Sequence, residues 1–272
     1  MKVAIQGIRG SFHHIVAEQY FGTNTQLLEC MTFSEMPDLL HTKEASVAIM
    51  AIENSIAGAL LPNYALIDEH NLAISGEYYL PILHNLMALK GQGISDIKEV
   101  YSHPMALLQC RKFFKSHPHI KLIEDQDTAE VARRIQKNKL KGVGAIASKM
   151  AASYYDLTIL AAEIQTIKNN ATRFVILNNS GLKTNPLADK ASIKFILEHK
   201  TGSLGEVLQI FSKHKVSLSK IQSLPVIESP WEYAFFADLV FGSYQDYQSA
   251  MHEVASKVSD LKIVGEYKKS KR

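Results

Sequence analysis

Short apolar runs of strand length alternate with amphipathic stretches of helix length from the N-terminus to about residue 180. Val3 to Ile5, Val47 to Ile52 and Val143 to Ala147 are apolar runs, whereas Phe12 to Tyr20 and Thr128 to Lys137 have helical character. This alternation predicts an α/β fold with a parallel sheet and helices on both faces. The pattern restarts after about residue 75, so we expect two lobes.

The remaining elements of this region follow the same alternation. Strands are expected at residues 72–74, 78–89, 100–102, 120–123, 157–160 and 174–177, and helices at 34–43, after Pro104 and after Ser148. Asp127 precedes the helix that begins at Thr128 and is a typical N-cap residue. Strands 157–160 and 174–177 are interpreted as returning to the first lobe.

A polar segment at residues 178–189, rich in Asn, Ser, Gly and Lys, is expected to be an interdomain linker. Beyond it, strands are expected at residues 192–198, 216–221, 233–240 and 261–267. The two intervening helices have apolar faces formed by Leu204, Val207, Leu208 and Phe211, and by Tyr247, Ala250, Met251 and Val254. The order βαββαβ predicts a ferredoxin-like domain. Its sheet would have helices on one face only, which favours dimerisation to cover the other face or an edge.

Composition excludes several classes of protein. Hydrophobic residues at 46% and charged residues at 21% are ordinary globular values, so disordered and fibrous classes are excluded. The net charge of +3 does not indicate a nucleic-acid partner, and we interpret the basic YKKSKR end as a solvated tail. No apolar run is long enough for a membrane span or signal peptide. Cys30 and Cys110 lack metal-ligand spacing, so we expect a cytoplasmic protein without zinc or disulfides.

Polar and glycine residues follow two of the buried strands. Gly7, Gly10 and Ser11 lie between a strand and a helix, where free backbone N–H groups and the helix dipole favour an anion. The spacing matches neither a dinucleotide fingerprint nor a P-loop. Asn54 and Ser55 come directly after the second strand, where they either contact a ligand or cap a turn.

The segment NNATRFVIL places a hydroxyl and a guanidinium at the head of a buried strand. Strand alternation puts Thr172 and Phe174 on one face and Arg173 on the other. Arg173 is therefore either a carboxylate clamp reached through a bend or an ion pair that braces the Glu53 loop. His84 and His103 act either as structural hydrogen-bonding groups or as acids.

Seven ordered segments resemble the prephenate dehydratase family. They are GxxGSF (Gly7 to Phe12), AIENSxxG (Ala51 to Gly58), YLPIxHxL (Tyr79 to Leu86), YSHPxALxQC (Tyr101 to Cys110), DTAEVA (Asp127 to Ala132), AIAS (Ala145 to Ser148) and NxTRF (Asn170 to Phe174). The segments GSLGEVLQIF, SKIQSLP and WEYAFFAD resemble the ACT regulatory domain that such enzymes carry. The likeness covers nearly the whole chain.

This resemblance implies a domain organisation. Residues 1–182 would form a catalytic domain like the two-lobed periplasmic binding proteins, with its active site between the lobes. One lobe would hold about 1–75 with 157–182, and the other 76–156. Residues 190–272 would form the ACT domain.

The resemblance also implies an activity, the conversion of prephenate to phenylpyruvate, CO2 and water in phenylalanine biosynthesis, without a metal or organic cofactor. The family assigns the proton-donating role to the threonine of its TRF motif, here Thr172, beside Arg173 and Phe174. Candidate substrate-binding residues are Ser11, Asn54, Ser55, His84 and Asn170, together with the N-termini of the helices that begin at Phe12 and Thr128.

Several positions depart from the family pattern. Ile8 and Ser11 replace a proline and a threonine, and Ala57 stands where the family has an acidic residue, so that acid's contribution to the site cannot be assumed. Met105 replaces a glutamine. The family's GAL and ESRP segments, which hold phenylalanine at a dimer interface, are here Gly202, Ser203 and Leu204, and Gln222, Ser223, Leu224 and Pro225.

The resemblance therefore implies L-phenylalanine as an allosteric ligand and a homodimer or homotetramer. Because no chorismate mutase segment precedes Met1, a monofunctional enzyme is expected. Two alternatives stay open. Arogenate dehydratase acts on a substrate with an amine in place of the keto group, and a non-catalytic sensor would bind aromatic or amino acids without turnover.

Overall fold

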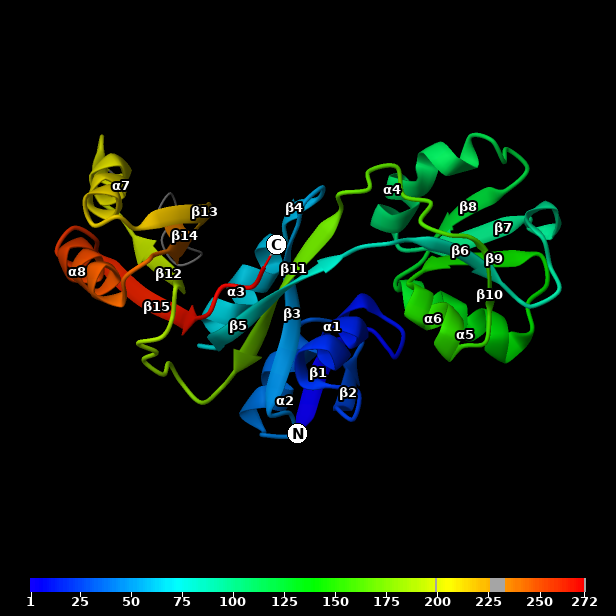
Figure 1. Cartoon of the computed structure of the whole chain (residues 1–272), viewed down its shortest axis with the longest axis horizontal. Helices are drawn as coiled ribbons and strands as arrows, with labels where there is room; N and C mark the ends of the chain where they lie inside the picture. Colours follow the sequence, from blue (N-terminus) through cyan, green and yellow to red (C-terminus); the bar gives the residue numbers. More distant parts are fainter. Residues whose placement is uncertain (199, 226–232, 272) are drawn as a thin grey trace. The chain divides into compact units, whose positions relative to one another are not determined.

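A computed structural model describes residues 1–198, 200–225 and 233–271 (Figure 1). The chain separates into two compact units, Met1–Asn63 with Tyr78–Phe174, and Tyr64–Glu77 with Val175–Arg272. Trp231 and Glu232 of the WEYAFFAD motif, and Arg272 of the basic tail, lie outside the described residues. In the described part of the chain, every helix is too short or too polar to cross a membrane.

The first sheet has the strand order β2-β1-β3-β11-β5, with β4 paired to β3. Its strands are β1 (Lys2–Gln6), β2 (Gln26–Cys30), β3 (Val47–Asn54), β4 (Gly58–Ala59), β5 (Ala73–Pro81) and β11 (Ala171–Asn178). The helices of this region are α1 (Phe12–Phe21), α2 (Glu35–His41) and α3 (Leu61–Glu69). Strand β1 pairs parallel with β2 and β3, as α/β alternation predicts.

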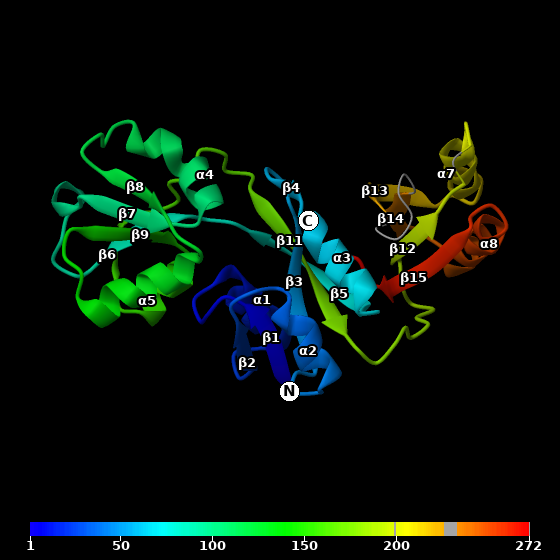
Figure 2. The same ribbon diagram turned by 180° about the vertical axis from the view of Figure 1, so that it is seen from behind.

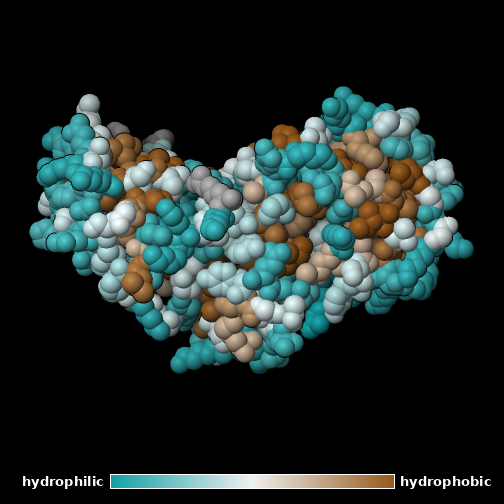
Figure 3. Space-filling model, in the orientation of Figure 1, coloured by the Kyte–Doolittle hydropathy of each residue, from teal (hydrophilic) through white to brown (hydrophobic). Residues whose placement is uncertain are grey.

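The second sheet has the order β10-β6-β9-β7-β8. Its strands are β6 (Asn85–Ala88), β7 (Glu99–Ser102), β8 (Lys121–Glu124), β9 (Val143–Ala147) and β10 (Thr158–Ala161). Helix α4 (Pro104–Phe114) covers one face, and α5 (Thr128–Asn138) and α6 (Lys149–Tyr154) cover the other (Figures 1 and 2). A 3₁₀ turn, Ile94–Asp96, precedes β7. Apolar side chains gather over this sheet on the face drawn in Figure 3.

The second sheet is mixed, which corrects the expectation of a parallel sheet. Strand β7 pairs parallel with β8 and β9, but β6 pairs antiparallel with both β9 and β10. Strand β6 follows β5 after only three residues and without a crossover helix, so it need not share the direction of the βαβ strands. The pairing of β10 with β6 also corrects the expected return of residues 157–160 to the first lobe.

The C-terminal region has the predicted ferredoxin-like order βαββαβ. Its elements are β12 (Lys190–Ile196), α7 (Ser203–Lys213), β13 (Ser217–Pro225), β14 (Tyr233–Val240), α8 (Tyr244–Ala255) and β15 (Asp260–Tyr267). The sheet order is β13-β14-β12-β15 with antiparallel pairs. Phe195 of β12, Phe211 of α7 and Tyr247 of α8 belong to one buried core, as helical periodicity predicts.

The sheet face away from these helices carries contacts from α3 and β5 within the same unit. Asp68 of α3 bonds Lys194 Nζ at 2.6 Å and Lys262 Nζ at 2.9 Å. Glu77 of β5 and Lys190 of β12 form a buried ion pair with a separation of 2.7 Å. Dimerisation was expected to cover either this face or an edge of the sheet, and α3 and β5 of the same unit cover part of this face.

Candidate active site

Thr172 is held at the start of β11 by the turn that follows β3. The Nδ2 group of Asn54 donates to Thr172 Oγ1 at 2.9 Å and to Asn170 Oδ1 at 2.8 Å. Asn54 Oδ1 in turn accepts from the backbone N–H groups of Ile56 and Ala57, each at 3.0 Å. Asn54 thus caps its turn, which is one of the two roles that the sequence left open, and it also holds Thr172, while its contact with a ligand stays a prediction.

Strand alternation separates Thr172 from Arg173. Thr172 and Phe174 line a cavity of about 320 Å³, whereas Arg173, which is 2% exposed, is not among its lining residues. Arg173 lies within strand β11, which runs from Ala171 to Asn178. Because Arg173 is absent from this cavity lining, both proposed arrangements, a clamp reached through a bend and an ion pair that braces the Glu53 loop, stay predictions.

The cavity is ringed by helix N-termini. Ser11, His103 and Asp127 all line it, and they are the N-cap residues of α1, α4 and α5, respectively. Each helix directs free N–H groups and the positive end of its dipole toward its cap. Three such ends around one space favour a ligand with more than one negative charge.

The polar side chains that line the cavity are neutral, except for the carboxylate of Asp127. The polar lining residues are Gln6, Ser11, His13, Asn54, His84, His103, Gln109, Gln126, Asp127, Thr128 and Thr172. Lysine and arginine do not occur among the described residues that line the cavity. An anion held here would therefore depend on backbone N–H groups and on neutral hydrogen-bond donors.

Burial shifts the pKa values of the titratable groups that line the cavity. It lowers the pKa of His13 to about 3 and that of His84 to about 4, and it lowers the pKa of His103. It raises the pKa of Asp127 despite hydrogen bonds from backbone N–H groups. Both His13 and His84 are consequently neutral imidazoles near pH 7.

Two of the predicted binding residues support the site from outside the cavity lining. Ser55 Oγ accepts from the backbone N–H of Ala171 at 3.0 Å, and it ties the β3–β4 turn to β11. Asn170 is 1% exposed, and its Nδ2 donates to Gln109 Oε1 at 2.8 Å. Ser11, Asn54 and His84, by contrast, all line the cavity.

Sequence reasoning missed Gln109 and His13. Gln109 Oε1 lies 3.0 Å from His84 Nε2 and also accepts from Asn170, so Gln109 joins α4 to the segment before β11. Its position four residues after the lining residue Met105, on one helix face, was the available signal. His13 packs edge-on against Phe174 with ring centroids 4.9 Å apart. Nothing in its local sequence distinguished it from a core residue.

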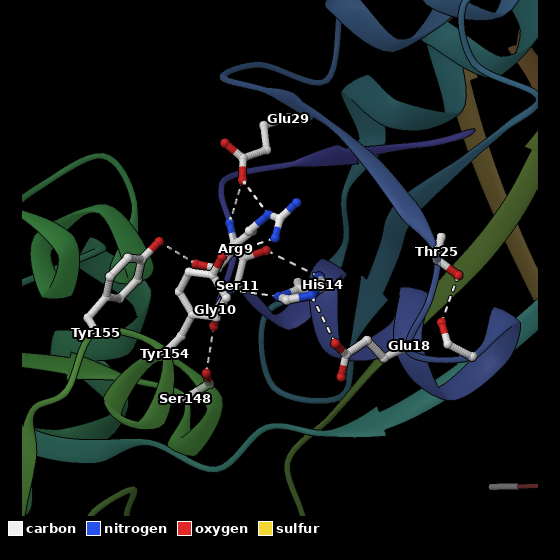
Figure 4. A network of polar contacts seen from close by, with 11 residues as sticks. Arg9, Gly10, Ser11, His14, Glu18, Thr25, Glu29, Ser148, Tyr154 and Tyr155 are labelled. Atoms are coloured by element: carbon white, nitrogen blue, oxygen red, sulfur yellow. Dashed lines mark hydrogen bonds and ion pairs between the residues drawn. The ribbon is translucent and has the colours of Figure 1, made fainter. Parts of the chain in front are cut away.

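Two hydrogen bonds connect the glycine loop before α1 to the two ends of α6, at Ser148 and Tyr155 (Figure 4). Ser148 Oγ donates to the carbonyl of Gly10 at 2.6 Å, and Tyr155 OH donates to the carbonyl of Arg9 at 2.7 Å. Gly10 has φ +90°, and a Cβ there would lie 2.9 Å from the backbone of Ala151. The loop that presents Ser11 therefore requires glycine at this position.

Replacing Ser148 with alanine should lower the free energy of unfolding by about 1–3 kcal/mol, because the carbonyl of Gly10 and the backbone N–H of Ala151 both lose their hydrogen-bond partner. Urea unfolding followed by circular dichroism measures this change. The matched control is Ser116→Ala, which removes an exposed hydroxyl contact and should change stability by less than about 0.5 kcal/mol. Equal losses in both variants would contradict the fastening role of Ser148.

The predicted allosteric segments lie in the ferredoxin-like region. Gly202 is the N-cap of α7 with φ +90°, and Ser203 and Leu204 begin that helix. Residues Gln222 to Pro225 form the end of β13, where they pair with β14. Among the described residues, no group of three or more His, Cys, Asp or Glu side chains is arranged to hold a metal ion.

Comparison with known proteins identifies relatives over the full chain. The family described as Prephenate dehydratase matches residues 3–181. The bifunctional chorismate mutase/prephenate dehydratase of Aquifex aeolicus (strain VF5) is 34% identical, over 99% of this chain and 74% of its own length. The arogenate dehydratase/prephenate dehydratase 2, chloroplastic, of Arabidopsis thaliana is 33% identical, over 98% of this chain and 72% of its own length.

A solved structure supports the same grouping. The prephenate dehydratase of Arthrobacter aurescens in complex with L-Phe superimposes with a TM-score of 0.87 at 25% identity, covering 98% of this chain and 90% of that chain. The match of the family to residues 3–181 includes both sheets and the whole cavity lining. The chain therefore belongs to the prephenate dehydratase family and is an enzyme of the carbon–oxygen lyase class.

Proposed function

We propose that this chain converts prephenate to phenylpyruvate, CO2 and water in phenylalanine biosynthesis, and that residues 1–182 form the catalytic domain. The observation that carries the proposal is the hydroxyl of Thr172 on the wall of a cavity ringed by three helix N-termini. The cavity volume of about 320 Å³ is at the lower end of the range for small-molecule sites, and suits a compact substrate.

The reaction needs orientation of a dianion and a proton for the leaving group. Breaking the carbon–carbon bond to the ring carboxylate releases CO2 and sends an electron pair into the ring. The ring carbon–oxygen bond breaks, and the hydroxyl leaves with a proton as water. Aromatisation drives both steps, so positioning and one hydrogen-bond donor are the main requirements.

Thr172 fits the role of that donor. Its oxygen accepts from Asn54, so its own hydrogen is available for the leaving hydroxyl. A threonine hydroxyl is a weak acid, and it therefore acts as a hydrogen-bond donor and proton relay rather than as a proton store. The N-termini of α1, α4 and α5 would hold the two carboxylates of the substrate, with Ser11 as one of the contributing caps.

Two substrates must be tested in parallel. Purified protein is incubated with prephenate and separately with arogenate, and phenylpyruvate and phenylalanine are quantified. The proposal expects a higher kcat/KM for prephenate. A higher value for arogenate would favour the second candidate, arogenate dehydratase, whose support is the name of the Arabidopsis relative. Binding of prephenate without product would instead indicate a sensor.

We also propose that residues 190–272 form an ACT domain that binds L-phenylalanine near Gly202, Ser203, Leu204 and the segment from Gln222 to Pro225. The support is the ferredoxin-like topology of this region and the L-Phe complex of the Arthrobacter relative. We further propose that the protein is a homodimer or homotetramer and that it acts in the cytoplasm. The two cysteines, Cys30 and Cys110, are buried free thiols, which suits a reducing compartment.

Phenylalanine at about 1 mM should raise the melting temperature and inhibit prephenate turnover, because a ligand that binds only the folded state stabilises it by mass action. Differential scanning fluorimetry and the prephenate assay measure the two effects, with glycine as the control amino acid. If phenylalanine changes neither quantity, feedback regulation of this chain is ruled out.

A further inference from the structure

We propose that an exposed hollow beside the C-terminal half of α4 binds the dianionic substrate before it enters the cavity that contains Thr172. This inference rests on the proposed function. The hollow has a volume of about 420 Å³, and its lining combines cationic with apolar side chains. The cations are Arg111, Lys112 and Lys115, and the apolar residues are Ile56, Leu108 and Ile167. We call this site the α4 hollow.

The cavity itself offers little long-range attraction to a dianion. Its described lining residues include no lysine or arginine, and they include one carboxylate, that of Asp127. The dipole of a helix acts mainly within its first turn, so the three N-termini act only on a ligand that has already entered. Cations placed near the cavity would supply the attraction that the lining lacks.

The cations of the α4 hollow are available to a ligand. Arg111, Lys112 and Lys115 are all exposed. Among the described residues, no carboxylate pairs with any of the three, and the lining of the hollow contains no Asp or Glu. The dipole favours cations at the C-terminus of α4, but it leaves their charges open to an anion. An arginine guanidinium can hold a carboxylate through two parallel hydrogen bonds.

The same hollow exposes apolar surface. Leu108 is 59% exposed, Ile167 is 52% exposed and Ile56 is 37% exposed. Large apolar side chains that share one hollow with unpaired cations favour a ligand with an apolar body and anionic groups. Prephenate matches both features, since its two carboxylates are carried on a carbon ring.

Gln109 connects the α4 hollow to the cavity, because it belongs to both linings. Arg111 and Lys112 follow it on α4, about 3 and 4.5 Å further along the helix axis. Both distances are shorter than the Debye length of about 8 Å at physiological ionic strength. Ile56 lies in the turn whose backbone N–H bonds to Asn54 Oδ1. A ligand in the hollow would therefore lie beside residues of the cavity wall.

The first test is the double variant Arg111→Gln with Lys115→Gln. Lys112 is retained because it also lines a second hollow, with Glu163. At low ionic strength we expect KM for prephenate to rise about 5- to 20-fold and kcat to stay within about twofold. In about 0.5 M salt the KM values of variant and wild type should agree within about twofold, because salt screens the lost attraction.

The matched control is Lys137→Gln with Lys141→Gln. These two lysines are exposed and lie outside both linings, so the net charge changes equally while KM should stay within about twofold. An equal rise of KM in the control would overturn the proposal. So would an unchanged KM in the Arg111→Gln, Lys115→Gln variant, or a rise that salt does not reduce.

Leu108→Gln distinguishes a binding site from long-range attraction alone. It removes apolar surface without changing the charge, and it should raise KM about two- to fivefold at every ionic strength, because salt does not screen apolar contacts. An unchanged KM would show attraction without a site and would overturn the proposal. Leu108 is exposed, so the variant should fold as the wild type does.

Calorimetric titration of each protein with prephenate separates this inference from the proposed function. If the wild type turns over prephenate and the α4 variants behave like it, only the α4 hollow is ruled out. If the wild type is inactive but binds prephenate, the proposed function fails, and weaker binding by the Arg111→Gln, Lys115→Gln variant than by the control still supports the hollow. A wild type that neither binds nor converts prephenate overturns both.

Discussion

Replacing Thr172 with valine should reduce kcat for prephenate by about 10²- to 10⁴-fold, the range for loss of a positioned proton donor. Valine has a similar shape but no hydroxyl, so the cavity wall is retained and the leaving group loses its donor. Asn54 keeps its contact with Asn170 at 2.8 Å, so the turn should remain in place. Product formation from prephenate at saturating substrate measures the loss.

The matched variants are Thr172→Ser and Thr158→Val. Serine retains the hydroxyl and should keep a substantial part of the activity. Thr158 lies in β10, outside the cavity lining, and its replacement should leave kcat within about twofold. A Thr172→Val variant with wild-type kcat would contradict the assignment of Thr172 as the donor.

Replacing Glu77 with leucine should lower the free energy of unfolding by about 3–5 kcal/mol, because the Lys190 ammonium then loses its buried carboxylate. The side chains of Lys190 and Glu77 are 3% and 1% exposed, and Glu77 also accepts from the backbone N–H of Ser270 at 3.1 Å. Urea unfolding measures the change. The effect concerns the contact of β5 with β12, so it should appear without any change in the cavity residues.

Two further variants distinguish the destabilising effect of an unpaired buried charge from a general loss of packing. The double variant Glu77→Leu with Lys190→Met removes both charges and should recover most of the lost stability. Lys213→Met breaks an exposed pair with Glu253 and should change stability by less than about 1 kcal/mol. If the double variant is less stable than Glu77→Leu alone, the explanation by an unpaired charge is wrong.

Local signals in the sequence predicted much of the site. Asp127 and Ser148 were expected at helix starts, and Ser11 beside one, and each accepts a hydrogen bond from its own helix. Capping is a short-range effect, so the residue type and its neighbours are sufficient evidence. The alternation that separates Thr172 from Arg173 is equally local, since it depends only on strand geometry.

Features that depend on distant parts of the chain were not predictable. Hydrophobic periodicity contains no information on strand direction, so the antiparallel pairing of β6 could not be read from it. Helix α3 was missed because its apolar and polar residues do not separate onto two faces: the polar Asn63 is buried, whereas the apolar Leu61 is exposed. Tyr64 packs against Phe236 of β14, with ring centroids 5.5 Å apart. That partner is remote in the sequence.

The contacts of Gln109 with Asn170 and His84 illustrate the same limit at the site. Each lies in a segment that the family resemblance marked, yet only the structure shows that one oxygen of Gln109 serves both Asn170 and His84. The direction of that network is a property of several segments together. Sequence reasoning identified the participants Asn54, Asn170 and Thr172 without their connections.

We propose that the cavity beside Thr172 converts prephenate to phenylpyruvate. The most direct measurement is the stoichiometry of products when the purified wild-type protein is incubated with prephenate. We expect one phenylpyruvate and one CO2 for each prephenate consumed, at a rate that exceeds the uncatalysed reaction. Prephenate bound but recovered unchanged would contradict it.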